Sequence, residues 1–496
     1  MEWLDPISIL LLFVLTVIFF MKSEKFWHRR SRDDFPPGPT PLPIIGNLHI
    51  MDLKRPYRTM LELSKKYGPV VSIQMGCQKM VVLSGYKMVK EALVNQADAF
   101  AERPKIPVFE DTSKGYGVTF SHGKNWKVMR RFTLTTLRDF GMGKRVIEDR
   151  IVEESRFLIE DIESQKGKPF EITTIMNAAV ANIIASIIFG ERFDYKDPVF
   201  LRLLNLISET LRLIGSPSVT LYNTFPFLGF LVRNYKTVLH SMSELYSFIW
   251  LIFKERLKEL DKNDQRSLID VFLVRQQEEK SDSNGYFHND NLISLVNNLF
   301  VAGTDTTSTT LRWGLLLMIK YPKVQIKVQE EIARVIGSAQ PRTEHRTQMP
   351  YVDAVVHEIQ RFSNIVPMGL PHETTEDVSL KGYFIPKGTY IIPLLASVLQ
   401  DESQWETPDT FNPEHFLDSE GKFVKKEAFM PFSAGRRMCA GETLAKMELF
   451  LFFTSLLQRF TFHPPPGVTR TALDLTPAIG LITTPEPYKI CAEPRS

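Results

Sequence analysis

The sequence of 496 residues has few cysteines and no multi-ligand metal motif. Its three cysteines, Cys77, Cys439 and Cys491, are an odd and sparse set. They cannot form a disulfide framework and fit a reducing compartment. Neither C-x-x-C nor H-x-x-x-H occurs, which disfavours zinc and iron–sulfur sites, because those sites need several such ligands. The net charge of only +3 gives no reason to expect a nucleic acid as partner.

The sequence also lacks a nucleotide-binding motif. The stretch from Gly117 to Lys124 resembles a phosphate loop, but five residues rather than four separate its glycines and Asn125 follows. Residues 139–141 read Asp-Phe-Gly without the other kinase motifs. No G-x-G-x-x-G follows a predicted strand. Electrons for any redox chemistry would therefore have to come from another protein.

The N-terminus carries a long apolar run, Ile7 to Met21, that is marginally long enough to span a bilayer. A cleaved signal peptide and a buried core helix are the alternatives. Both fit poorly, because acidic residues lead the run and no small-x-small cleavage site ends it. Residues 1–21 carry −2 and residues 22–32 carry +4, so we expect an uncleaved anchor with the body of the chain in the cytosol.

A basic and Pro-rich linker, residues 22–43, should hold the anchor apart from the rest of the chain. No repeat or second linker follows, so residues 44–496 are predicted to form one catalytic domain. Its class is mainly α with a minor β-sheet (α+β). Strand pairs are predicted for 70–75 with 80–83 and for 378–385 with 390–394. Helical periodicity is found in 122–138, 147–165, 197–214, 237–260, 290–320, 322–337, 351–362 and 440–459.

The most informative stretch, residues 429–441, immediately precedes an apolar helix. Cys439 lies at the start of this helix, where the dipole favours an anion, and Arg436 and Arg437 are expected to lower its pKa further. Gly435 and Gly441 permit a close approach of a flat cofactor. Such a thiolate suits either nucleophilic catalysis or metal ligation, and the spacing alone does not decide between them. A single thiolate ligand points to haem.

The pattern Phe432-x-x-Gly435-x-Arg437-x-Cys439-x-Gly441 resembles the haem-binding signature of the cytochrome P450 superfamily at every fixed position. The chain looks closest to the vertebrate-type microsomal branch, which oxidises drugs, fatty acids and steroids. The resemblance implies haem b bound by the Cys439 thiolate, which pushes electron density to favour O–O cleavage.

A polar cluster, residues 302–307, interrupts a long apolar helix. Because Gly and Thr are poor helix formers, a local opening is expected at Gly303. The cluster resembles the family's oxygen-activation motif, which implies catalytic roles for Gly303 and for Asp305 and Thr306 as a proton-relaying pair. Asn298, Ala302 and Thr306 are four residues apart, so they share one helix face, which should look toward the substrate.

Other family elements follow in the expected order. Glu358 and Arg361 resemble the E-x-x-R element that ties the core together, and His415 replaces the arginine that is usually their third partner, which leaves the charge of that arm open. Trp126 and Arg130 resemble the W-x-x-x-R that reaches the haem propionates. By the same resemblance, further propionate partners are Arg103, His372 and Arg437, and further substrate contacts come from 104–118, 200–230, Val366 and Ile479.

The resemblance implies a monooxygenase that inserts one atom of O2 into lipophilic molecules: xenobiotics, steroids or fatty acids such as arachidonate-type lipids. Electrons would come from NADPH through a membrane-bound cytochrome reductase, with cytochrome b5 as a second candidate donor, at the endoplasmic reticulum membrane. Seven basic residues and one acid between Lys124 and Arg145 could steer an acidic donor. The alternatives are a haem-thiolate isomerase or dehydratase that needs no reductase, and a membrane-anchored haem or lipid carrier.

Overall fold

The computed structural model describes residues 34–279 and 285–495, which form two compact units. One unit runs up to Pro104 and includes Met368–Ser397, and the other comprises Lys105–Pro367 and the chain from Val398 onward. The predicted anchor, residues 1–21, and the linker up to residue 33 lie outside the described residues. No helix in the described part of the chain is long and apolar enough to cross a membrane.

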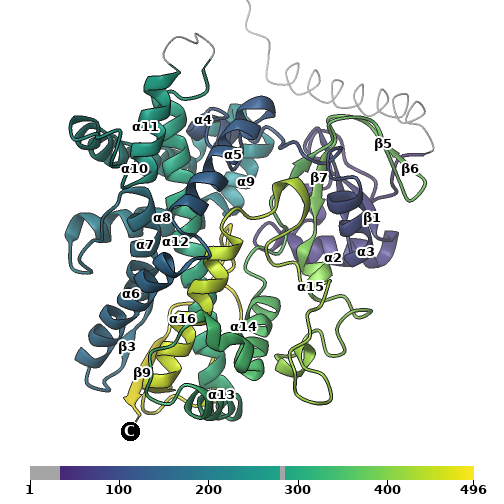
Figure 1. The fold of residues 1–496 in the computed structure, drawn as a ribbon. Coiled ribbons are helices and arrows are strands. Elements are labelled where there is room, and N and C mark those ends of the chain that lie inside the picture. The colour runs from purple at the N-terminus through teal and green to yellow at the C-terminus, as the bar shows by residue number, and fades with distance from the viewer. Residues whose placement is uncertain (1–33, 280–284, 496) are drawn as a thin grey trace, which may run out of the picture. The chain divides into compact units, whose positions relative to one another are not determined.

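The first unit combines small sheets with short helices (Figure 1). Its elements are η1 (Leu48–Ile50), α2 (Pro56–Tyr67), β1 (Val70–Met75), β2 (Gln78–Leu83), α3 (Tyr86–Lys90), the π-helix η2 (Glu91–Asn95), β4 (His372–Glu373), β5 (Val378–Leu380), β6 (Tyr383–Ile385) and β7 (Tyr390–Pro393), and the boundary falls within α15 (Leu395–Leu399).

The four-stranded sheet has the order β1-β2-β7-β4, and the predicted pairing of β1 with β2 is confirmed. The second predicted pair is wrong. The stretch 378–385 folds on itself as the β5–β6 hairpin, and β7 pairs instead with β2 in parallel and with β4. The reason is local: Lys381 and Gly382 both adopt positive φ, which makes a tight turn within the stretch that we expected to be one strand.

The second unit is mainly helical and contains every predicted helix. Its helices are α4 (Pro107–Ser113), α5 (Gly123–Asp139), α6 (Arg145–Ser164), α7 (Thr173–Ile188), α8 (Pro198–Ile214), α9 (Pro217–Thr224), α10 (Arg233–Lys258), α11 (Leu268–Glu278), α12 (Asn289–Lys320), α13 (Pro322–Val335), α14 (Pro350–Ser363) and α16 (Glu442–Arg459). Short 3-10 turns are η3 (Pro226–Leu231), η4 (Thr343–Gln348), η5 (Pro413–Phe416), η6 (Gly435–Arg437) and η7 (Arg470–Ala472), and β3 (Phe170–Glu171), β8 (Phe460–His463) and β9 (Lys489–Pro494) form a sheet.

The long helix α12 is central to this unit and packs on α7, α10, α14 and α16 (Figure 1). It is an uninterrupted α-helix, so the expected opening at Gly303 is wrong. The Thr304 and Thr306 hydroxyls donate to the carbonyls of Phe300 and Ala302, four residues back, without breaking the helix. Gly303 instead permits close packing, because a Cβ there would lie 3.0 Å from Ile184 Cγ1 of α7.

Candidate active site

The loop before α16 holds Cys439 in a fixed backbone frame. Its backbone N–H donates to the Phe432 carbonyl at 3.0 Å. Ser433 and Gly435 both adopt positive φ, which turns the chain back toward the helix start. The Cys439 side chain is exposed, and a Cβ built at Gly441 would meet only the Cys439 sulfur, at 4.0 Å, among the described residues. The loop therefore leaves accessible space beside the sulfur, as a flat cofactor requires.

The expected lowering of the Cys439 pKa by Arg436 and Arg437 is wrong. Although part of the side chain is accessible, surrounding protein atoms desolvate the sulfur and raise its pKa. The backbone N–H groups of Gly441 and Glu442 and the charge of Arg130 oppose this effect without overcoming it. A metal ion coordinated by the sulfur would favour the thiolate form.

Trp126 and Arg437 form a stacked pair next to this loop. The Arg437 guanidinium lies 3.7 Å from the centroid of the Trp126 ring, and its Nη2 donates to the Ser121 carbonyl at 2.9 Å. Both side chains are buried. No described residue accepts a hydrogen bond from the buried Trp126 Nε1. A buried N–H without an acceptor costs free energy unless a ligand supplies one, so this donor fits an anionic group such as a haem propionate.

The other predicted propionate partners occupy different surroundings. Arg130 of α5 donates from Nη2 to the Met438 carbonyl at 2.7 Å, which ties α5 to the cysteine loop. Arg103 and His372 belong to the first unit and are buried there. Arg103 donates to the Leu370 and Pro371 carbonyls, and His372 Nδ1 lies 2.6 Å from the Phe100 carbonyl.

One face of α12 remains accessible where the rest of the helix is packed. Ala302 is exposed, and Asn298 and Thr306, one turn to either side, are half-buried, whereas their neighbours are largely buried. The Asn298 side-chain oxygen accepts from the Val118 and Thr119 backbone N–H groups at 2.9 and 3.1 Å. The shared face is therefore real, and Asn298 also fixes the loop that follows α4.

Asp305 lies on a different side of α12 from Thr306. It is 4% exposed, and its Oδ1 accepts from the Ser208 hydroxyl of α8 at 3.1 Å. Burial raises its pKa, and the Ser208 hydrogen bond and the charge of Arg312 oppose this. The contacts among described residues do not join Asp305 to Thr306, because consecutive helical residues point about 100° apart.

The two remaining substrate candidates lie on adjoining segments. Val366 and Ile479 are both half-buried. Thr483 donates its backbone N–H to the Ile365 carbonyl at 2.9 Å, and Leu481 donates to the Leu211 carbonyl of α8 at 3.1 Å. These bonds bring the segment after α14 and the C-terminal loop together beside the end of α8.

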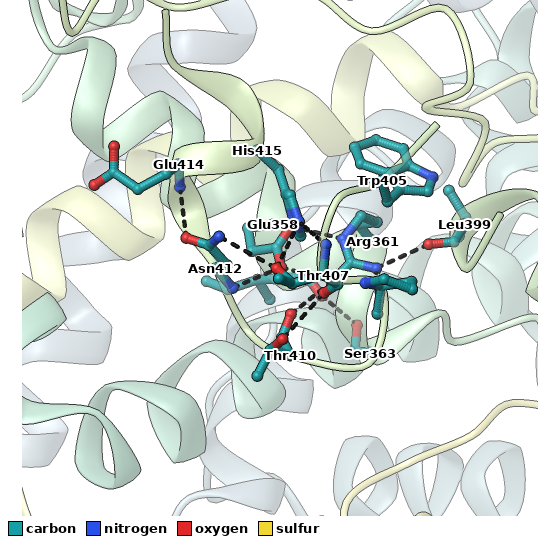
Figure 2. A network of polar contacts seen from close by, with 12 residues as sticks. Glu358, Arg361, Ser363, Leu399, Trp405, Thr407, Thr410, Asn412, Glu414 and His415 are labelled. Atoms are coloured by element: carbon teal, nitrogen blue, oxygen red, sulfur yellow. Dashed lines mark hydrogen bonds and ion pairs between the residues drawn. The ribbon is translucent and has the colours of Figure 1, made fainter. Parts of the chain in front are cut away.

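Glu358 and Arg361 form an ion pair that is completely buried (Figure 2). Two parallel hydrogen bonds of 2.7 Å join the guanidinium to the carboxylate. The remaining guanidinium N–H groups donate to the carbonyls of Leu399, Pro408 and Thr410 at 2.8 to 2.9 Å. The pair thereby ties α14 to the irregular chain that follows α15.

His415 completes this network as a neutral side chain (Figure 2). Its Nδ1 lies 3.2 Å from Glu358 Oε2, and its Nε2 lies 3.2 Å from the Thr407 backbone nitrogen. A backbone N–H can only donate, so Nε2 must accept and the ring proton must be on Nδ1, donating to Glu358. The charges of the network are therefore those of Arg361 and Glu358, and the position that is usually an arginine contributes none.

A buried carboxyl group on α16 escaped the sequence analysis. Glu448 is 2% exposed, and burial raises its pKa to about 8, opposed by a hydrogen bond with Thr307 of α12. It keeps its proton at neutral pH next to the proposed substrate helix. In the sequence, the one indication of this group is a single acidic residue within the apolar run 447–453.

Comparisons with known proteins agree with this geometry. A family profile described as Cytochrome P450 matches residues 36–492. The chain is 54% identical to cytochrome P450 2K4 of Oncorhynchus mykiss, over 93% of this chain and 92% of that protein. It is 54% identical to cytochrome P450 2K6 of Danio rerio, over 92% and 90%, and 47% identical to cytochrome P450 2B4 of Oryctolagus cuniculus, over 93% and 94%.

These matches cover nearly the whole chain and therefore support the general chemistry of the family for this protein. They imply haem b with a cysteine thiolate ligand, a partner reductase, lipophilic substrates and association with the endoplasmic reticulum membrane. The chain belongs to the cytochrome P450 family and is a haem-thiolate monooxygenase that uses O2 and NADPH-derived electrons to oxidise xenobiotics, fatty acids or steroids.

Proposed function

We propose that Cys439 is the thiolate ligand of the haem iron and that Trp126, Arg130 and Arg437 hold the propionates. The observation that best supports this assignment is the buried Trp126 Nε1 beside the stacked Arg437, because this N–H has no acceptor among the described residues and an anion could supply one. Arg103 and His372 are proposed as further propionate partners. When bound, the haem supplies the activation of O2.

The accessible face of α12 is the proposed substrate side. Asn298, Ala302, Val366 and Ile479 would contact the substrate, and Thr306 would hold a proton on its hydroxyl at this face. Asp305, whose pKa burial raises, would lie behind it as an acidic group hydrogen-bonded to Ser208, and Gly303 sets the distance between α12 and α7. Glu358, Arg361 and His415 are proposed to act structurally.

The helix α5 offers a docking surface for an electron donor. Its buried side carries Trp126, while its exposed side carries Lys124, Lys127, Arg131 and Arg138 at helical spacing. One helix thus connects a basic surface to the proposed propionate contacts. We assign this surface to the membrane-bound NADPH–cytochrome P450 reductase, with cytochrome b5 as a second donor.

The charge reversal Lys127→Glu, combined with Arg131→Glu, should slow reduction by the reductase about tenfold at low salt, because a repelled donor associates more slowly. The difference should shrink as salt screens the charges. Stopped-flow reduction rates over a salt series measure this. Lys236→Glu, an exposed charge reversal on α10, is the control and should leave the rate unchanged. Equal rates for the double variant and the control would reject the docking surface.

The proposed arrangement at the membrane has residues 1–21 as a transmembrane anchor, 22–43 as a linker and 44–496 as the catalytic domain on the cytosolic side. In the second unit, the turn η3 exposes Phe227, Phe230 and Leu231 by 68 to 72%. Such an apolar surface would be stabilised by burial in the bilayer interface, where lipophilic substrates also partition.

A further inference from the structure

A chain of three polar side chains crosses the apolar core where α7, α8 and α12 pack on one another (Figure 1). Asn177 of α7 donates from Nδ2 to the hydroxyl oxygen of Ser208 on α8 at 3.3 Å. The Ser208 hydroxyl donates in turn to Asp305 Oδ1 of α12 at 3.1 Å. Asn177 and Asp305 are each only 4% exposed. The three residues are far apart in the sequence, so only the tertiary fold joins them.

The hydrogen bonds of this chain run in one direction, from Asn177 toward Asp305. The amide nitrogen of Asn177 can only donate, so it occupies a lone pair of the Ser208 oxygen. A serine hydroxyl carries one proton, and this proton is therefore left for Asp305. When Asp305 is ionised, this hydrogen bond is charge-assisted and stronger than a neutral one. Asn177 thus acts on Asp305 through Ser208.

Packing alone does not explain the polar residues at these positions. The Oδ1 of Asn177 is buried and accepts no hydrogen bond from any described residue, which costs free energy. The remaining side chains of α7 are mostly apolar and buried, so a leucine would pack there without this cost. Ser208 likewise lies between Leu204 and Leu211 of α8, which are both buried. Polar residues placed against the local pattern are typical of functional sites.

The Asp305 carboxyl group depends on Ser208 because so little else opposes its burial. Burial raises the pKa of Asp305, and two groups lower it, first the Ser208 hydrogen bond and then the charge of Arg312. Arg312 lies two turns further along α12 and is itself buried, and its charge also interacts with Tyr488 and Glu171. Ser208 is therefore the larger of the two influences that favour the ionised form of Asp305.

We propose that Ser208 and Asn177 are positioning residues for Asp305. Ser208 holds the carboxyl group in one orientation on the α8 side of α12, and Asn177 keeps the Ser208 proton directed at it. Both residues act on the reaction through Asp305, so the proposal rests on the proposed function, in which Asp305 is the acidic group behind Thr306.

The test uses the haem-loaded full chain and follows the infrared carboxyl band of protonated Asp305 against pH. This band is identified by its loss in Asp305→Asn. In Ser208→Ala, the midpoint of the titration should move upward by about one pH unit, because the ionised carboxylate loses a charge-assisted hydrogen bond. Ser208→Thr retains a hydroxyl and should titrate close to the wild type.

Two further variants test the part of Asn177. Asn177→Leu should move the midpoint in the same direction by less than Ser208→Ala does. The double variant should titrate like Ser208→Ala, because Asn177 acts through Ser208. Denaturant unfolding of Asn177→Leu should show no loss of stability, since the leucine also removes an unpaired buried oxygen. A loss of stability with an unchanged midpoint would assign Asn177 a structural role only.

Tyr195→Phe is the matched control. Tyr195 donates to Glu154 Oε1 at 2.5 Å, so this variant also removes a hydroxyl from a buried carboxylate, but from one on α6. The midpoint of Asp305 should stay at its wild-type value. An equal shift in Tyr195→Phe and Ser208→Ala would overturn the proposal, because the effect would then not depend on the bond to Asp305.

A second readout separates the positioning role from the function proposed for Asp305. It is the amount of product formed from arachidonic acid per NADPH consumed, measured with the reductase over the same pH range. We expect the pH dependence of this ratio to move together with the infrared midpoint in Ser208→Ala. An unchanged infrared midpoint in this variant would refute the positioning role. A shifted midpoint with an unshifted product ratio would leave the positioning role intact and reject the part of Asp305 in proton transfer.

Discussion

A Thr306→Ala variant should form product about 10²-fold more slowly than the wild type while it continues to consume NADPH. The Thr306 hydroxyl lies on the accessible face of α12 and donates to the Ala302 carbonyl at 2.7 Å. This bond orients the hydroxyl and leaves the lone pairs of its oxygen able to accept a hydrogen bond from a proton donor at that face; the hydroxyl can donate its own proton there only when it turns away from Ala302. Alanine preserves the helix but leaves no group that can hold or move a proton at that position.

The measurement is the ratio of product formed to NADPH consumed, with the substrate-binding spectrum recorded for the same preparation. Thr306→Ser keeps a hydroxyl at the same place and should retain most of the activity. A product ratio in Thr306→Ala equal to that of the wild type would show that the hydroxyl has no part in proton delivery.

An Arg361→Ala variant should lose about 3–5 kcal/mol of folding free energy. The substitution leaves the Glu358 carboxylate completely buried without its cation. It also strips donors from the Leu399, Pro408 and Thr410 carbonyls. His415 already contacts Glu358 through Nδ1 and Thr407 through Nε2, so it replaces none of the hydrogen bonds that Arg361 makes.

Denaturant unfolding measures this loss. The control is Arg275→Ala, which breaks ion pairs with Glu278, at the same i,i+3 spacing, and with Glu279; the Arg275 side chain is more than half exposed. The control should cost at most about 1 kcal/mol. Equal midpoints for the two variants would mean that the buried network is not what holds α14 to the chain after α15.

The sequence predicted the long helices α5, α6, α8, α10, α12, α13, α14 and α16. It did not name α2, which buries only Met60, or α11. It also missed α7, which is buried on nearly all sides and therefore has no apolar period to detect. It also misassigned the β5–β6 hairpin, because a turn of two residues with positive φ is hard to recognise around a lysine. These errors come from tertiary burial and backbone geometry, which local pattern does not encode.

For the candidate site, too, the sequence identified residues in contiguous motifs but not contacts that depend on the tertiary fold. Contiguous motifs identified Cys439 and Trp126, whose surroundings in the structure fit a haem. The partners of Asp305 and Glu448 come from α8 and α12, far away in the sequence, and only the fold brings them together. The pKa of Cys439 was misjudged for a related reason: the sequence shows nearby charges but not the desolvation that outweighs them.

The most direct test of Cys439 as haem ligand is the absorbance spectrum of the reduced protein under carbon monoxide, recorded for the wild type, Cys439→Ser and Cys439→His. We expect a strongly red-shifted Soret band in the wild type, as a thiolate ligand gives, and its absence from both variants. A histidine-like band in the wild type, or a red-shifted band that survives in the variants, would contradict the assignment of Cys439.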